Sequence, residues 1–211
     1  SDSVAAAPQK TDVAAVSPEQ IIKAADNEKV ITYLCQTRKI HPKIVNRLIE
    51  QGLIWQEAES GNAVFSTEDG IPIVIYGTDA DGKPFKRSVR AADGKQRYWH
   101  CENPLPNGDM SRVLVTEDVI DAISLYELSG GDWTCGYMYV SMEGVENTWV
   151  IDDLLGRLND PHDRFYDASV TIATDNDEAG NACASKYPKI SREVPDIGRD
   201  WNEKLRKKKC S

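Results

Sequence analysis

The stretch SVTIATDNDEAGNACASKY, residues 169–187, indicates the fold most directly. It begins with a run of apolar and β-branched residues that is typical of a buried strand. It then passes through an acidic turn that contains glycine and continues into a helical pattern. A buried strand that leads directly into a helix is the repeating unit of α/β proteins. This stretch therefore predicts an α/β domain.

Segments on both sides of this stretch alternate in the same way. The expected strands and helices, in chain order, are VLVT (113–116), DVIDAISLYEL (118–128), YMYVSM (137–142), TWVIDDLLGRL (148–158) and a short strand in KISREV (189–194). Strands that alternate with helices of this length imply a parallel sheet covered by helices. Residues 112–211 are therefore expected to form one α/β domain with a mainly parallel sheet flanked by helices.

The residues before this domain follow a different pattern. Apolar residues alternate with period two in AVFS, IPIVIY, KPFKRSVR and QRYWH, which are separated by turn-forming sequences rich in Asp and Gly. We expect these four segments to form an antiparallel meander. A helical head is expected ahead of it, with one helix from the capping sequence at Ser17, one around residues 30–34, and one that begins at His41-Pro42 and ends at Gly52. Residues 17–111 are thus expected to form a small α+β domain.

The first 16 residues contain no aromatic residue and no sustained apolar period, and they are biased towards Ala, Ser and Pro. Such a segment cannot bury enough surface to offset the cost of ordering it. We expect residues 1–16 to be a flexible linker. A chain that begins with a linker and without Met is also expected to be part of a longer protein.

Composition excludes several classes of protein. The chain has 211 residues, a formal net charge of −9 and a hydrophobic content of 40%, which is enough to form a core. Its apolar runs are far shorter than the ~20 residues needed to cross a bilayer, and a secretory signal pattern is absent from its start. The five cysteines are odd in number and never spaced as CxxC, which argues against a disulfide framework or a zinc ribbon. We therefore expect a cytoplasmic protein without a membrane partner.

Acidic residues gather where the expected strands of the second domain end. Function in a parallel sheet collects at the carboxyl ends of the strands, and the loops there hold Glu117, Asp175, Asp177 and Asp200. Carboxylates that are brought together repel one another unless a cation neutralises them, and oxygen ligands suit Mg²⁺ or Mn²⁺. The alternative is that each residue only complements the dipole of a helix in its first turn. The grouping of all four at one edge favours a metal site.

At these residues the sequence resembles a known family. The segments VLVTEDVIDAISL, SMEG, SVTIATDNDEAGNACA and VPDIGRDWNEKL look like the successive motifs of the Toprim domain, the metal-binding α/β module of bacterial primases, topoisomerases and some nucleases. The match extends over residues 112–205, about half of the chain. The preceding half, with YLCQTRKI, LIEQGLIWQ and NAVFS, is similar to a small domain of unknown function found before Toprim domains in proteins of bacterial plasmids and conjugative elements.

The resemblance implies a role for each acidic residue. It implies that Glu117 acts as general acid or base, that Asp175 and Asp177 ligate Mg²⁺, and that Asp200 is a further candidate ligand. Gly180 would permit close packing where a helix begins, and Gly144 would permit a tight turn beside the site. The sequence departs from the primase pattern at Asp118, where primases usually have glycine, and it has no zinc-binding segment.

The clearest basic patch of the chain lies within residues 83–99. It contains Lys83, Lys86, Arg87, Arg90, Lys95 and Arg97. Phe85, Tyr98 and Trp99 lie between these cations, and aromatic faces beside cations on a sheet suit single-stranded nucleic acid. The alternative is a solvated sheet face whose aromatic residues pack inward. The adjoining metal site favours DNA as the partner. Single-stranded DNA is the form whose bases can stack on these aromatic side chains.

These features predict Mg²⁺-dependent phosphoryl or nucleotidyl transfer on DNA, either primase-like or nuclease-like, in a DNA-processing protein of a mobile element. The alternative belongs to another class: a non-catalytic DNA-binding or assembly module in which the acidic cluster is vestigial or structural. The presence of all four acidic residues favours the enzyme. Primer synthesis, cleavage and ligation stay open at this point.

Overall fold

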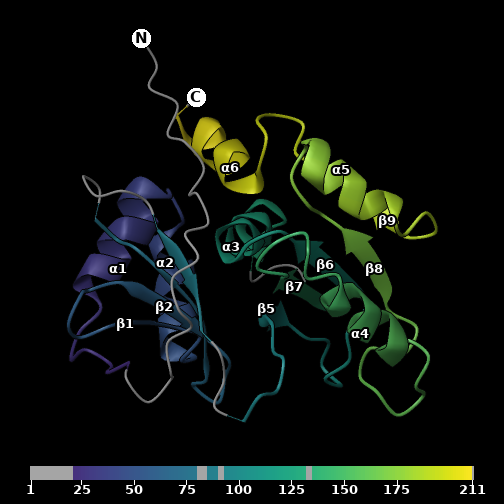
Figure 1. Cartoon of the computed structure of the whole chain (residues 1–211), viewed down its shortest axis with the longest axis horizontal. Helices are drawn as coiled ribbons and strands as arrows, with labels where there is room; N and C mark the ends of the chain where they lie inside the picture. The colour runs from purple at the N-terminus through teal and green to yellow at the C-terminus, as the bar shows by residue number, and fades with distance from the viewer. Residues whose placement is uncertain (1–20, 80–84, 90–92, 132–134, 211) are drawn as a thin grey trace. The chain divides into compact units, whose positions relative to one another are not determined.

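The computed structural model describes residues 21–79, 85–89, 93–131 and 135–210 (Figure 1). The chain forms two compact units. The first contains residues 45–97 and the described residues before 38, and the second contains residues 38–44 and those from 98 onward. Each unit has a sheet of its own.

The first unit is built on a four-stranded antiparallel sheet in the order β1-β2-β3-β4. Its strands are Ile54–Gln56 (β1), Ala63–Ser66 (β2), Pro72–Tyr76 (β3) and Lys86–Ser88 (β4). One face carries Phe65 against Tyr76, with ring centroids 5.3 Å apart, and the other carries the buried cluster of Trp55, Val64 and Ile75. The meander expected from AVFS, IPIVIY and KPFKRSVR is therefore confirmed, and the three-residue β1 joins it as a strand that the sequence pattern did not reveal.

Short helices precede this sheet. They are α1 (Glu28–Thr32), a π-helical turn η2 (Tyr33–Thr37) and α2 (Pro42–Glu50). The start of α2 is as predicted, because His41 Nδ1 accepts the backbone N–H of Lys43 at 3.2 Å. The helix expected from Ser17 is wrong in its described part and otherwise lies outside the described residues. Residues 22–24 are extended instead, with Lys23 bridging to Glu57 beside β1.

The second unit is built on a five-stranded sheet in the order β5-β7-β6-β8-β9. Its strands are Trp99–Asn103 (β5), Arg112–Thr116 (β6), Tyr137–Ser141 (β7), Ser169–Ile172 (β8) and Ser191–Arg192 (β9), and its helices are Val119–Leu128 (α3), Trp149–Arg157 (α4), Glu178–Ser185 (α5) and Trp201–Lys209 (α6). Strands β6 to β9 run parallel, and β5 is antiparallel to β7. The expected α/β fold with a mainly parallel sheet is confirmed.

One strand belongs to a different sheet from the one expected. The segment QRYWH was predicted to be the last strand of the meander, and this prediction is wrong. Trp99–Asn103 pairs with β7 in the second sheet, with Trp99 opposite Ser141. Alternation with period two reveals a strand but not its partner, because both sheets offer an antiparallel edge to a segment of this composition.

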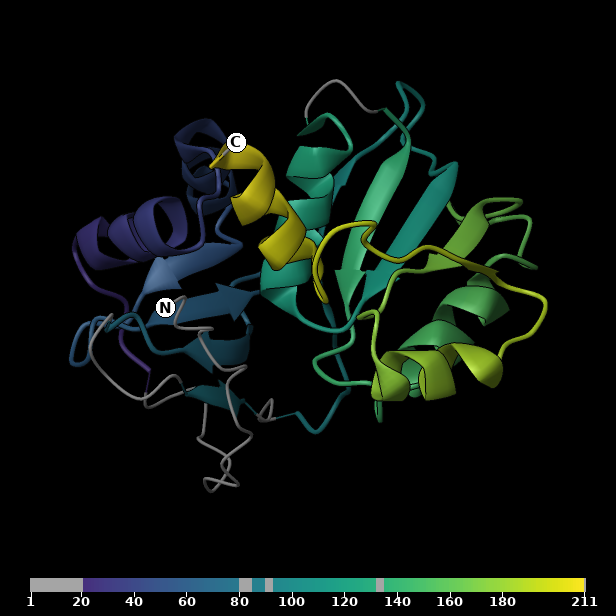
Figure 2. The ribbon, with the colours of Figure 1, turned by 90° about the horizontal axis from the view of Figure 1, so that it is seen from above.

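Helices cover both faces of the second sheet (Figures 1 and 2). On one face, Tyr126 of α3 packs edge-on against Tyr139 of β7, and Trp201 of α6 donates its indole N–H to the backbone just after β8. On the other face, Val150 of α4 and Cys183 of α5 join one buried apolar cluster. This arrangement leaves the carboxyl ends of β6 and β8 as the place where loops and helix starts meet. Within the described ranges, no helix has the length and apolar content needed to span a membrane.

Candidate metal site

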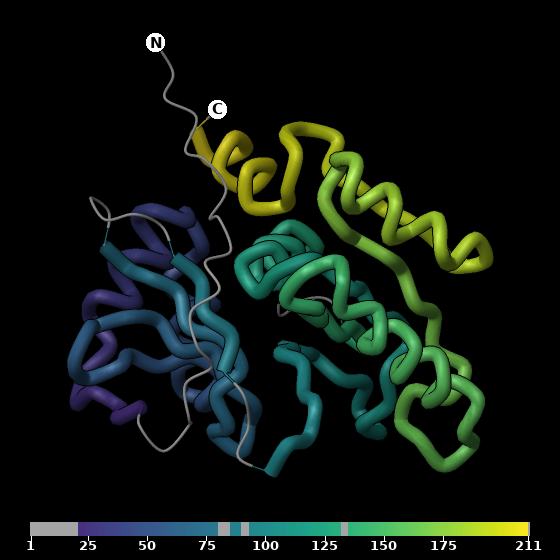
Figure 3. Tube along the Cα trace, viewed as in Figure 1, coloured from purple at the N-terminus to yellow at the C-terminus, as the bar shows by residue number. Residues whose placement is uncertain are grey.

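The site is built at the carboxyl edge of the second sheet. β6 pairs in parallel with β8, so that Val115 lies opposite Ile172. Glu117 follows β6 directly, and Asp175 follows β8 after two further residues. Because parallel strands end at the same edge, the structure places these two predicted residues on the same side of the sheet. Figure 3 traces the chain from the end of β8 into α5, back to β9 and on to α6.

Asp175 is the most deeply buried of the four predicted carboxylates. The residue is 7% exposed, and its Oδ1 has no hydrogen-bond partner among the described residues. Burial, together with the negative charges of Glu117, Asp118 and Asp200, raises the pKa of Asp175 to about 8. The nearby Arg199 guanidinium acts in the opposite direction. Asp175 therefore lies in an excess of negative charge that a cation would relieve.

Three other acidic residues of the edge begin helices. Asp118 accepts the backbone N–H of the third residue of α3 at 3.0 Å, Asp177 does the same for α5 at 2.9 Å, and Asp200 does so for α6 at 2.6 Å. The helix-terminus role considered from the sequence is therefore present, and it occupies one oxygen of each carboxylate. Asp118, whose purpose the sequence left open, caps α3 and adds its charge to the edge.

The other three predicted residues do not act equally on the pKa of Asp175. Burial and the charge of Asp118 raise the pKa of Asp200, whereas a backbone hydrogen bond opposes this shift. Asp177 is half-buried, lies on the same loop as Asp175, and is not among the main charges that act on it. As the side chains stand, no three His, Cys, Asp or Glu residues of the described ranges are spaced to hold a metal ion. Mg²⁺ is usually held by one or two carboxylates, with waters and substrate phosphates completing its shell, so the donor set fits this ion.

Arg192, in β9, holds the loop that carries the candidate ligands. Its guanidinium donates to the carbonyl oxygens of Gly180 at 2.5 Å and Asp175 at 3.0 Å, to Thr174 Oγ1 at 2.9 Å and to Asn181 Oδ1 at 2.8 Å. The sequence analysis missed this residue, because its partners lie 11 to 18 positions earlier in the chain. The four hydrogen bonds identify Arg192 as a positioning residue for this loop.

Two glycines shape the edge as the resemblance implied. A Cβ at Gly180 would overlap the carbonyl oxygen of Asp175 and lie 3.1 Å from its carbonyl carbon, so only glycine fits there. Gly144 adopts φ 123°, which favours glycine, and its N–H donates to the carbonyl of Glu117 at 2.9 Å. Close packing at Gly180 and a tight turn at Gly144 are both confirmed.

A buried carboxylate supports the start of α6. Asp121 of α3 is 5% exposed and accepts the backbone N–H of Asn202 at 3.0 Å, while Asn202 Nδ2 donates to Ser124 Oγ at 2.9 Å. Burial holds the pKa of Asp121 well above its usual range, with the charges of Asp118 and Asp200 adding to the effect. Asp121 therefore fixes the helix start that presents Asp200. The spacing from Asp118 to Asp121 resembles a capping box and was the available sequence signal.

Replacing Arg192 by Gln is expected to lower Mn²⁺ affinity about 10-fold or more, because the loop that carries Asp175 loses its four fixed hydrogen bonds. Arg112→Gln is the matched control: Arg112 of β6 bonds Thr171 of β8 and Glu193, which follows β9, and its hydrogen bonds with described residues do not include the loop of residues 174–181. Both variants should lose a similar amount of thermal stability. Isothermal titration calorimetry with Mn²⁺ separates them, and equal affinities would show that Arg192 does not position the site.

In the first unit, carboxylates pair with part of the basic patch. Arg97 donates to both oxygens of Asp93, at 2.8 and 2.5 Å, and Arg87 lies 3.9 Å from Glu57. Lys86 lies over the Tyr76 ring at 5.5 Å. Lys95 is exposed, whereas Lys83 and Arg90 lie outside the described residues.

The aromatic residues of the patch do not all suit stacking on bases. Trp99 is fully buried in β5, and Tyr98 packs beside Trp149 with its hydroxyl near Arg157. The inward-packing alternative therefore holds for these two aromatic residues. Phe85 is half-buried. The expectation of a stacking surface is wrong for Trp99, because this residue is fully buried and cannot present its ring to a base.

Two family models match the chain. Residues 114–205 match the model described as Toprim-like, and residues 32–104 match a model described as a protein of unknown function, DUF3991. The second unit is therefore a Toprim-like domain. The chain contains this domain preceded by a small domain of unknown function, and the resemblance seen in the motifs is confirmed. Among curated proteins, none matches the chain at a significant level.

Two solved structures from bacteriophage T7 are similar in part. The first is the primase fragment of the primase-helicase protein, with 16% identity, a TM-score of 0.45, and coverage of 79% of this chain and 65% of that one. The second is the lagging-strand DNA polymerase interacting with primase domains bound to an RNA/DNA hybrid and dTTP, with 15% identity, a TM-score of 0.47, and coverage of 79% and 81%. This chain thus spans 65% of the length of the primase fragment.

Proposed function

We propose that the Toprim-like domain carries out phosphoryl or nucleotidyl transfer on DNA with Mg²⁺ or Mn²⁺ as cofactor. The observation that carries the proposal is Asp175, a buried carboxylate with one oxygen that lacks a hydrogen-bond partner among the described residues, next to the charges of Glu117, Asp118 and Asp200. A hard divalent cation is the group that such an arrangement stabilises. The proposed setting is a cytoplasmic DNA-processing protein of a plasmid or other mobile element, within a longer chain.

In this proposal Asp175 would hold the ion together with Asp177 or Asp200 from the adjacent helix starts. When bound, the ion would neutralise phosphate oxygens and orient the attacking oxygen. Glu117 would accept or donate a proton at the attacking or leaving oxygen, because it follows β6 at the same edge. Arg192 would keep the Asp175 carbonyl and the start of α5 in place during the proton transfer.

A non-catalytic module is the second candidate, and a specific observation favours it. Asp118, Asp177 and Asp200 each cap a helix, so the acidic edge has a structural purpose without any reaction. In this case the domain would bind DNA or assemble with other subunits, and the carboxylates would serve only the fold.

Assays of turnover separate the two candidates. The chain would be incubated with Mg²⁺ or Mn²⁺, nucleoside triphosphates, and labelled single-stranded or duplex DNA, and the products would be resolved by length. We expect metal-dependent extension or cleavage that Glu117→Gln abolishes while metal binding is kept. Metal binding without any product on either DNA would favour the non-catalytic module.

DNA attraction is proposed to come from the basic patch of the first unit. Lys86→Glu with Lys95→Glu is expected to weaken binding to single-stranded DNA about 10-fold and to flatten its salt dependence, because fewer counterions are released. Reversing two exposed lysines of the other unit, Lys189 and Lys208, changes the net charge equally and serves as control. Fluorescence anisotropy at several salt concentrations measures both effects. Equal losses in the two double variants would show a general charge effect and no DNA contact at the patch.

A further inference from the structure

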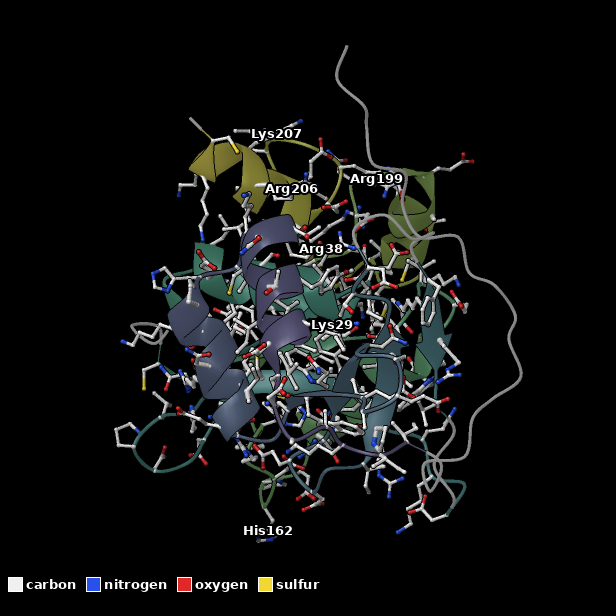
Figure 4. The ribbon with its side chains drawn as sticks, turned by 90° about the vertical axis from the view of Figure 1, so that its left-hand side faces the viewer. Lys29, Arg38, His162, Arg199, Arg206 and Lys207 are labelled. Atoms are coloured by element: carbon white, nitrogen blue, oxygen red, sulfur yellow. The ribbon has the colours of Figure 1, made fainter. Side chains whose placement is uncertain are left out.

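A single guanidinium lies between the carboxylates of the acidic edge. Arg199 Nε is 3.8 Å from Asp175 Oδ2, and its Nη2 is 3.7 Å from Asp200 Oδ2. These distances allow charge attraction but exceed normal hydrogen bonds. Among its contacts with described residues, the guanidinium makes no hydrogen bond. Its side chain is 46% exposed, and Figure 4 labels both Arg199 and Arg206 of α6.

The backbone of Arg199, in contrast, is fixed. Its N–H donates to Glu203 Oε2 at 2.8 Å, and its carbonyl accepts the N–H of Asn176 at 2.8 Å. Gly198 just before it adopts φ 82°, and a Cβ there would meet the Glu203 side chain at 2.8 Å. The Cα of Arg199 is therefore tied to the loop that carries Asp175, while the side chain can turn.

Arg192, at the same edge, is an arginine whose guanidinium is held by hydrogen bonds, and it differs from Arg199 in this respect. Its guanidinium makes four hydrogen bonds to the loop, whereas that of Arg199 faces two carboxylates at longer distance. A cation in this position neutralises the edge while no metal is bound. Its charge would also repel a cation added at Asp175, so the two positive charges compete for the same carboxylates.

We propose that Arg199 is a resident counter-ion of the acidic edge, that a divalent cation displaces it, and that the displaced guanidinium then contacts a phosphate of the nucleic acid. This inference rests on the proposed function, because it requires a divalent cation at Asp175. The planar fork of an arginine fits two phosphate oxygens at once, and the half-exposed side chain can reach solvent. Arg199 would thereby make metal binding and DNA binding favour one another.

The proposal predicts effects of opposite sign from one substitution. Arg199→Gln should raise Mn²⁺ affinity in the absence of DNA about 3- to 10-fold, because the competing charge is removed. The same variant should lose about 10-fold in affinity for DNA in the presence of Mn²⁺, because a charge-assisted phosphate contact is lost. A merely structural residue would weaken both. Arg199→Lys keeps the charge without the fork, so it should keep wild-type Mn²⁺ affinity and recover only part of the DNA affinity.

The test measures free Mn²⁺ by electron paramagnetic resonance, and DNA binding by fluorescence anisotropy with a nuclease-resistant phosphorothioate oligothymidylate. Arg206→Gln removes the same charge from the exposed side of α6 and is the control. Mn²⁺ affinity of Arg199→Gln that equals the control, or falls below it, overturns the inference while leaving the metal site intact. Absence of Mn²⁺ binding in both wild type and Arg199→Gln overturns the proposed function as well.

Discussion

Changing Asp175 and Asp177 together to Asn is expected to lower Mn²⁺ affinity more than about 100-fold while the fold is kept. At Asp175 the substitution removes a carboxyl group whose ionisation is disfavoured by burial and by the negative charges around it, so the neutral amide is no harder to bury. At Asp177 the new side chain can still cap α5, because Asn is as good an N-cap as Asp. The metal-free variant should therefore melt at the wild-type temperature or above it.

The matched control for this double variant lies at the opposite edge of the same sheet. Asp109 and Asp167 are exposed and precede β6 and β8, so Asp109→Asn with Asp167→Asn removes the same charge far from the carboxyl ends. Calorimetry with Mn²⁺ compares the two, and thermal unfolding checks the fold. If both variants bind Mn²⁺ as the wild type does, the assignment of Asp175 and Asp177 as ligands is wrong.

Replacing Gly180 by Ala is expected to destabilise the protein by about 2–4 kcal/mol. The added Cβ would overlap the carbonyl oxygen of Asp175, a backbone atom that Arg192 also holds. The loop cannot give way without breaking that hydrogen bond, so Mn²⁺ affinity should fall together with stability.

Gly156→Ala supplies the comparison. Gly156 lies inside α4, and a Cβ there would meet nothing within 4 Å, so this variant should gain up to about 1 kcal/mol from helix propensity. Both substitutions add one methyl group to a helix. The difference between their effects on the free energy of unfolding therefore reports the contact with Asp175. Denaturant unfolding measures it. Similar stabilities in the two variants would contradict the close approach at Gly180.

Periodicity predicted most of the second unit, because each strand and helix there is decided locally. SVTIAT and EAGNACASKY became β8 and α5, and VLVT became β6. The pairing of strands is decided by distant residues, so the sheet to which QRYWH belongs could not be predicted. The helix expected from Ser17 is wrong in its described part for a similar reason, since residues 22–24 run beside β1.

In the candidate site, the residues that follow strands could be predicted, and the residues that act through distant contacts could not. Glu117 and Asp175 follow strands, and strand direction alone places them at one edge. The arginines were not predictable, because Arg192 and Arg199 act on atoms that only the folded chain brings near them. The sequence also could not show that one carboxylate oxygen of Asp177 accepts a hydrogen bond from the start of α5, although an Asp before a helix is a common N-cap.

Crystals of the intact chain grown with Mn²⁺ would test the central claim most directly, because the anomalous scattering of manganese locates the ion without reference to activity. The account predicts an anomalous peak within coordination distance of Asp175 Oδ1, with Arg199 turned away from Asp175 and Asp200. A map with manganese bound elsewhere and none at Asp175 would contradict it.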